Sequence, residues 1–140
     1  MEKYSSNKVL LMPYLIVFIG AGLGGAMRHG VNQIAARMLG VAFPYGTLTV
    51  NVLGSLAMGL LAEFFALKSE LPQEVRLFLT TGVLGGFTTF STFSLDTISL
   101  WERGQWLAAA SYAATSVAFS LLGLVAGLVL VRLLVQGQAA

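Results

Sequence analysis

The chain lacks cysteine and contains few charged residues, and both absences exclude whole classes of chemistry. Without cysteine in its 140 residues, it has no disulfide, thiolate nucleophile or thiolate metal site. Its single histidine, His29, cannot build a histidine metal cluster. Charged residues make up 10% of the chain, whereas a soluble domain usually carries about 25%. The net charge of +2 and pI near 9.2 do not indicate a nucleic-acid partner.

Long apolar runs replace the missing charge, since 56% of the residues are hydrophobic and the mean hydropathy is +0.81. Four runs without Asp, Glu, Lys or Arg, at 9–27, 38–62, 77–95 and 104–131, each reach the roughly 18–20 residues needed to cross a bilayer. They predict an all-α integral membrane protein with four transmembrane helices. The single four-helix transmembrane domain, 1–140, has helices expected at about 13–38, 47–67, 73–101 and 105–134. Residues 1–8 are expected to be a short polar tail, and the first run is too long for a cleaved signal.

Positive charges hardly distinguish the two sides of this membrane protein. With the N-terminus in the cytoplasm, five Lys or Arg residues lie inside and two lie outside. The inside set is Lys3, Lys8, Lys68, Arg76 and Arg132, and the outside set is Arg37 and Arg103. Orientation normally follows a clear cytoplasmic excess. The slight excess permits insertion in both orientations and hence an antiparallel dimer, although a modest N-in preference explains it equally well.

The run at 77–95 has an unusual composition for a membrane helix. Residues 82–94 include three glycines, several Ser and Thr hydroxyls, and Phe90 and Phe93 one helical turn apart. Irregular or polar backbone is tolerated in a membrane where protein or a watery cavity satisfies it. From this composition we expect the third helix to break near Gly85–Gly86 and to resume to about Trp101. In transporters, such breaks are places where ions are coordinated. The alternative is an unbroken helix with a glycine-lined packing face, which the hydroxyls do not favour.

The other runs contain isolated polar residues, and each has two interpretations. Arg28 either attracts anions or reaches an interface and caps carbonyl groups. Asn51 either lines a pathway or makes a polar contact between helices. Tyr112, Ser116 and Ser120 repeat every four residues and so form one polar stripe. Hydroxyl groups in membrane helices often bond to their own backbone, which is the simpler interpretation of that stripe.

The inventory of polar groups indicates the class of substrate. No acidic residue lies near the centre of any run, and this disfavours a proton-coupled cation exporter. Neutral donors beside one arginine suit a small anion, and the positive edges of Phe90 and Phe93 can also face an anion. A small multidrug-resistance-type exporter needs a glutamate in the first helix that this chain lacks. A non-transporting membrane assembly subunit would not explain the hydroxyl-rich segment.

Two motifs carry a resemblance to a known family. The segment 85–94, Gly-Gly-Phe-Thr-Thr-Phe-Ser-Thr-Phe-Ser, follows Thr81-Gly82, and Gly-Thr-Leu-Thr-Val-Asn occupies 46–51. In these motifs, and in length, helix count and motif order, the chain closely resembles the Fluc/CrcB family of fluoride channels. The resemblance implies a channel, not an enzyme, that passively exports fluoride across the bacterial cytoplasmic (inner) membrane and reduces fluoride toxicity. It also implies an antiparallel dual-topology homodimer in the lipid bilayer.

The same resemblance implies roles for particular residues. The fluoride pathway would comprise Asn51, Phe90, Phe93, Tyr112, Ser116, Ser120 and Arg28. A structural sodium ion would lie at the dimer centre, held by the main-chain carbonyls of Gly85 and Thr88. The resemblance assigns no role to His29.

Overall fold

The computed structural model describes the backbone of residues 2–67 and 71–136 and the side chains of 11–67 and 71–135. These residues form helices joined by turns. Three helices are long and apolar enough to cross a membrane: α1 (Glu2–Leu39), α2 (Tyr45–Leu67) and α6 (Trp106–Gln136). The tail side chains of Lys3 and Lys8, and the loop residue Lys68, lie outside the described parts.

The segment expected to form the third span is a succession of shorter elements. In order they are α3 (Gln73–Leu77), a π-helical segment η1 (Phe78–Leu84), α4 (Gly85–Phe87) and α5 (Phe90–Glu102). The expected tail boundary is wrong, because α1 already begins at Glu2 and continues through Pro13. Residues 2–12 contain neither glycine nor proline, so nothing in them stops the helix before Pro13.

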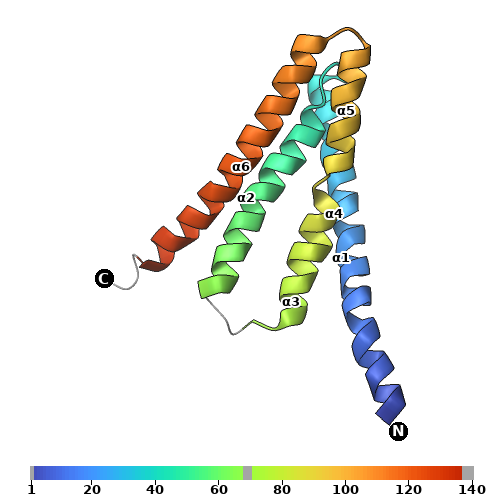
Figure 1. Cartoon of the computed structure of the whole chain (residues 1–140), viewed down its shortest axis with the longest axis vertical. Helices are drawn as coiled ribbons and strands as arrows, with labels where there is room; N and C mark the ends of the chain where they lie inside the picture. Colours follow the sequence, from blue (N-terminus) through green and yellow to red (C-terminus); the bar gives the residue numbers. More distant parts are fainter. Residues whose placement is uncertain (1, 68–70, 137–140) are drawn as a thin grey trace.

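The helices form two columns that converge at one end (Figure 1). Helices α2 and α6 run side by side in the same direction, while α1 lies along the column that α3, η1, α4 and α5 build. The turns α1–α2 and α5–α6 share the converging end, and both termini lie towards the other. The most extensive contact joins α2 to α6, and α1 packs on η1 and α4.

Glycines set the distance between neighbouring helices within the chain. A Cβ on Gly24 of α1 would overlap the carbonyl oxygen of Val83, and one on Gly59 of α2 would overlap that of Leu124. A Cβ on Gly127 of α6 would likewise overlap the carbonyl oxygen of Leu56. Small residues permit such close backbone approach in membranes. These three glycines therefore serve packing within one chain.

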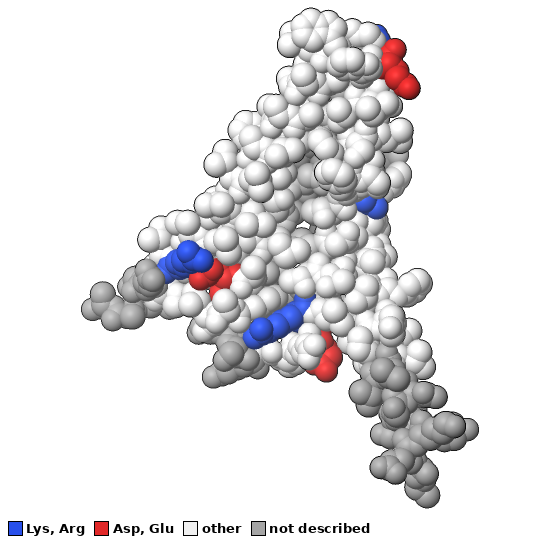
Figure 2. Space-filling model, viewed as in Figure 1, with Lys and Arg blue, Asp and Glu red and all other residues white. Residues whose placement is uncertain are grey.

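The buried core is small and most large apolar side chains face outward. The largest fully buried side chains are those of Val50, Leu100 and Tyr112, whereas Phe18 and Met38 are each 77% exposed. The face in Figure 2 is uncharged over most of its length, and its charged groups gather mainly towards the ends. An apolar surface of this extent indicates contact with lipid or with another protein.

Candidate functional site

The helical backbone that starts at Gln73 is interrupted at Thr88 and Thr89. Both residues are extended, with φ −82°, ψ 159° and φ −155°, ψ 119°. Gly85 is helical, with φ −63° and ψ −37°, so the prediction of a break near Gly85–Gly86 is wrong in position by about one turn. Gly86 serves close packing instead, because its Cβ would overlap the backbone of Ala21. The interruption falls on two β-branched residues, which favour extended backbone.

Side chains from two other helices satisfy the backbone of the interruption. The Thr89 N–H donates to Asn51 Oδ1 at 2.8 Å, and Asn51 Nδ2 donates to the Thr89 carbonyl at 3.0 Å. Arg28 Nη1 donates to the Thr88 carbonyl at 3.3 Å, and the Thr88 N–H donates to the Leu84 carbonyl at 3.0 Å. All four main-chain groups of the two threonines therefore have partners without water, as a non-aqueous environment requires.

A side-chain hydrogen bond next to the interruption caps the start of the following helix, α5. Thr89 is the N-cap of α5, since its Oγ1 accepts from the Thr92 N–H at 3.2 Å. Gly54 of α2 allows the interruption to lie close, because a Cβ there would overlap the methyl group of Thr88. From the sequence, Thr89 was only one of the hydroxyl residues of the unusual segment, and neither its capping role nor Gly54 was predicted. A threonine three residues before another polar residue at a helix start was the available signal for the cap.

A pocket of about 290 Å³ lies beside the interruption, between α2, α5 and α6; we call it the central pocket. It brings together five of the seven predicted pathway residues: Asn51, Phe90, Phe93, Ser116 and Ser120. The lining contains no charged residue and combines amide, hydroxyl and aromatic groups with aliphatic ones. The pocket is open on one side, where the Phe90 ring is 77% exposed.

Two predicted pathway residues lie outside the lining of the central pocket. Tyr112 is fully buried behind it, with its ring centroid 5.4 Å from that of Phe93 and 5.5 Å from that of Phe43. Arg28 reaches the interruption from α1, where it contacts the Thr88 carbonyl. Both are adjacent to pocket-lining residues, and their proposed roles in ion passage remain predictions.

Several hydroxyl groups of the chain bond to the backbone of their own helix, but those of two serines in the polar stripe do not. The backbone-bonded hydroxyls donate to the carbonyl three or four residues earlier: Thr80, Thr88, Ser94, Thr97, Ser111 and Thr115. Ser116, in contrast, is 4% exposed and its Oγ has no hydrogen-bond partner in the described structure. Ser120 likewise makes no hydrogen bond to any residue that the structure describes, and it lines the same pocket. The simpler interpretation of this stripe, backbone bonding, is therefore wrong for both serines.

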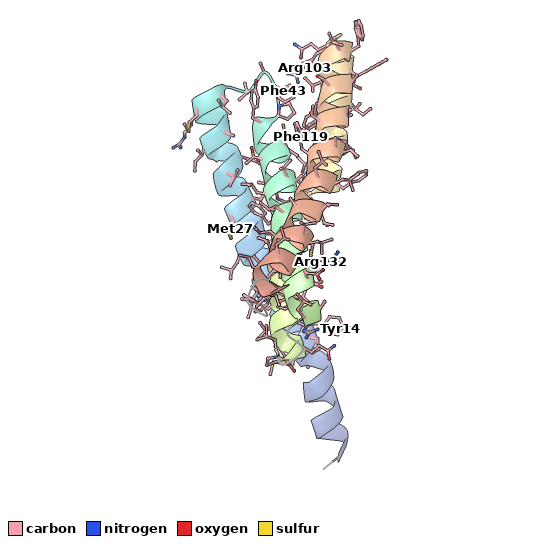
Figure 3. The ribbon with its side chains drawn as sticks, turned by 90° about the vertical axis from the view of Figure 1, so that its left-hand side faces the viewer. Tyr14, Met27, Phe43, Arg103, Phe119 and Arg132 are labelled. Carbon is pink, nitrogen blue, oxygen red and sulfur yellow. The ribbon has the colours of Figure 1, made fainter. Side chains whose placement is uncertain are left out.

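A second pocket of about 270 Å³ lies near the turn between α1 and α2; we call it the end pocket. Asp96 and Arg103 both line it, and Figure 3 shows Arg103 near Phe43 at this end of the molecule. Tyr112 Oη donates to Asp96 Oδ2 at 3.4 Å, so one tyrosine contacts both the end pocket and Phe93. The sequence reasoning missed Asp96 because it immediately follows the charge-free run 77–95.

The main chain of α4 offers oxygen atoms that a hard cation accepts. The Thr89 N–H would normally bond to the Gly85 carbonyl in a continuous helix, but it donates to Asn51 instead. Gly85 is exposed, and its carbonyl has lost that donor. The Thr88 carbonyl accepts from Arg28 and retains a second lone pair. Among the described residues, no cluster of His, Asp or Glu offers a different metal site.

Comparison with known proteins agrees with the motifs. Residues 15–128 match the family described as CrcB-like protein, Camphor Resistance (CrcB). The chain belongs to this family. The match runs from α1 to α6, so it includes the interruption and every residue that lines the central pocket. The resemblance found in the sequence is thereby confirmed for the CrcB-like family.

Similar curated proteins are named as channels. One from Granulibacter bethesdensis is 58% identical over 127 residues, covering 91% of this chain and 100% of the relative. One from Methylobacterium nodulans is 60% identical over 118 residues, covering 84% and 94%. One from Rhodopseudomonas palustris is 57% identical over 121 residues, covering 86% and 98%. All three are named fluoride-specific ion channel FluC. With its three apolar helices, this CrcB-like chain is a multi-pass membrane protein.

Proposed function

We propose that this protein is a fluoride-selective channel and not an enzyme. The observation that carries the proposal is the central pocket, where five predicted pathway residues meet and Ser116 has a buried hydroxyl without a partner in the described structure. In this proposal fluoride leaves the cell passively through the bacterial cytoplasmic (inner) membrane, which lowers its toxicity. The names of the relatives support the same ion.

The chemistry of the pocket suits a small, strongly hydrated anion. Moving a small ion from water into a low dielectric costs on the order of 20 kcal/mol, so the protein must replace water with donors. Ser116 and Ser120 have free hydroxyl groups within the described structure, and Asn51 retains one amide N–H after bonding to Thr89. The edges of Phe90 and Phe93 supply further positive potential while the rings stay apolar. Chloride is larger and a weaker acceptor, so it gains less from the same donors.

We propose further that two chains form an antiparallel dual-topology homodimer. Phe90 is 77% exposed although it lines the open side of the central pocket. On α1, a Cβ added to Gly22 or Gly25 would meet no atom within 4 Å, so a second chain has room to approach there. A partner that covers the open side of the central pocket would enclose the pocket and bury Phe90. The near-balance of positive charges supports insertion in both orientations.

A structural sodium ion at the dimer centre fits the carbonyl groups of the interruption. The Gly85 carbonyl lacks its helical donor, and the Thr88 carbonyl has one lone pair beyond the Arg28 contact. A bound cation would be coordinated by the Gly85 oxygen, which lacks its helical donor, and by the remaining lone pair of the Thr88 oxygen. If so, replacing sodium with choline in the buffer lowers the thermal stability of the purified dimer. An unchanged melting temperature would remove sodium from the proposal without affecting the channel itself.

The decisive experiment measures fluoride efflux from liposomes that contain the purified protein, with chloride as the control ion. Phe90→Ile tests the pathway, because Phe90 is exposed and its loss removes little packing. Phe119→Ile is the matched control on α6, since Phe119 is 52% exposed and lines neither the central pocket nor the end pocket. We expect strong fluoride efflux, weak chloride efflux, and a large loss with Phe90→Ile alone. Equal efflux of both ions, or none, would overturn the channel.

A further inference from the structure

We propose that the Ser55 hydroxyl of α2 is a further fluoride donor in the central pocket. The inference deepens the proposed channel function and rests on it. Ser55 lies four residues after Asn51, so both occupy the same face of α2. Both line the central pocket.

Ser55 lines the pocket at a level close to that of the serine stripe on α6. On α6, a Cβ on Gly123 would be 3.2 Å from the Val52 carbonyl oxygen and 3.6 Å from the Leu56 nitrogen. Val52 and Leu56 lie on either side of Ser55 in α2, so Ser55 and Gly123 are at similar heights along the paired helices. Ser120 lies about one turn before Gly123 in α6. The pocket therefore has a hydroxyl group from each of two neighbouring helices at this depth.

The two walls follow the same order of chemistry. Helices α2 and α6 run in the same direction (Figure 1). Along α2 the lining passes from Asn51 through Ser55 to Met58. Along α6 it passes from Ser116 through Ser120 to Leu124. Ser55 is thus the last polar side chain on its wall before the lining becomes aliphatic.

The Ser55 hydroxyl is free to turn towards an ion. It donates to no carbonyl of the described residues, unlike Ser111 of α6, whose Oγ donates to the Ala108 carbonyl at 3.1 Å. A hydroxyl without a competing acceptor can donate to fluoride, and hydrogen bonds to an ion are stronger than neutral ones. No charged side chain among the described residues lines the pocket to take over this task. The loss of one donor in the pocket should therefore lower fluoride efflux.

The experiment compares fluoride efflux through Ser55→Ala and Ser111→Ala with that of the unmodified protein in liposomes. Both changes remove one hydroxyl from a helix, but only Ser55 lines the pocket. We expect Ser55→Ala to lower fluoride efflux roughly tenfold, the factor for one hydrogen bond of ordinary strength, and Ser111→Ala to leave it unchanged. Ser55→Thr keeps the hydroxyl and should restore most of the efflux. Size-exclusion chromatography checks that each variant has the assembly of the unmodified protein.

The outcomes separate this inference from the proposed function. If the unmodified protein passes fluoride and Ser55→Ala behaves like Ser111→Ala, Ser55 is not a donor. If Ser55→Ala and Ser55→Thr lose efflux equally, the serine serves packing, and the inference is overturned. Absence of fluoride efflux from the unmodified protein would instead overturn the channel, and the Ser55 inference with it.

Discussion

Helix α2 makes two contacts of opposite kinds along its length. Towards its C-terminal half it lies against α6 through glycines, with Gly59 beside the carbonyl of Leu124 and Gly127 beside that of Leu56. Towards its N-terminal half it holds the interruption through the Asn51 side chain, which bonds to both main-chain groups of Thr89. In the first contact each helix satisfies its own backbone. In the second, one side chain satisfies the backbone of another element.

This difference explains where the central pocket lies. A glycine contact brings two backbones together and leaves no space for an ion. The contact made by the Asn51 amide lies beside the central pocket, where the hydroxyl groups of Ser55, Ser116 and Ser120 remain available as donors. We infer that the packed contact provides stability and the bridged contact provides the site.

The largest effect is expected from Gly59→Leu in the packed contact. A side chain there meets the backbone of α6, which cannot move aside as a flexible side chain would. Overpacking in a core typically costs 1–3 kcal/mol, and we expect a loss of at least about 3 kcal/mol because backbone is involved. The measurement is the yield of folded protein and its melting temperature in detergent. Gly30→Leu of α1 is the control, since no atom lies within 4 Å of its Cβ position, and equal losses in both would contradict the glycine contact.

A smaller loss of stability, with a larger loss of function, is expected from Asn51→Ala. The change leaves the Thr89 N–H and carbonyl without partners, and each unsatisfied group costs about 1–3 kcal/mol. The position of Asn51 in the central pocket predicts a loss of flux, and its two hydrogen bonds predict a lower melting temperature as well. Fluoride efflux and thermal unfolding of the same preparation measure both effects. Unchanged stability would show that the interruption does not depend on this amide.

The chemistry of these two contacts was predictable from the sequence to different degrees. Charge-free runs predicted the helices because hydropathy depends on composition alone. The position of the interruption was not predictable from glycine, since Gly85 is helical and the extended residues are Thr88 and Thr89. Their conformation depends on partners 60 and 38 residues away in sequence, Arg28 and Asn51. Such tertiary hydrogen bonds leave no local pattern.

The same limit applies to the site residues. The four-residue repeat placed Ser116 and Ser120 together, and the structure has both in one pocket. Whether a serine bonds to its own backbone depends on side-chain rotation and on neighbouring helices, and only the folded structure distinguishes Ser116 from Ser111. Ser55 follows Asn51 at the same spacing, so the signal for it was present in the sequence.

A moderate effect is expected from Arg28→Gln at the far side of the interruption. The variant loses the guanidinium contact to the Thr88 carbonyl, which is long at 3.3 Å, and we expect about 1 kcal/mol of lost stability. Thermal unfolding in detergent measures it, with Arg37→Gln as the control, because Arg37 is an exposed arginine of the same helix. If Arg28 also attracts anions, fluoride efflux through Arg28→Gln is lower than through the unmodified protein at low ionic strength. The difference between the two proteins becomes smaller in added salt. A melting temperature equal to that of the control would mean that Asn51 alone holds the interruption.

The smallest effect is expected from Glu63→Gln, beyond the glycines of the packed contact. Arg132 Nε lies 2.9 Å from Glu63 Oε1, and its Nη2 donates to Oε2 at 2.9 Å, which links α2 to α6. Figure 3 shows Arg132 far along the molecule from Arg103 and the end pocket. The Arg132 side chain is 53% exposed and that of Glu63 is 11% exposed. Water and salt screen the arginine end of the pair, and a glutamine at 63 removes the charge while it keeps a side chain that can accept from Arg132.

Glu63→Gln should therefore leave fluoride efflux unchanged, and any loss in melting temperature should be smaller than for Arg28→Gln. Arg132→Gln and the double variant complete a thermodynamic cycle that isolates the pair from its surroundings. Since Gly59 lies one turn from Glu63 on α2, this pair also tests whether the packed contact is independent of the pocket. If breaking the ion pair abolishes efflux while the protein stays folded, a change in the packed contact alters the donors of the central pocket. Stability and site would then belong to one coupled unit of α2 instead of two.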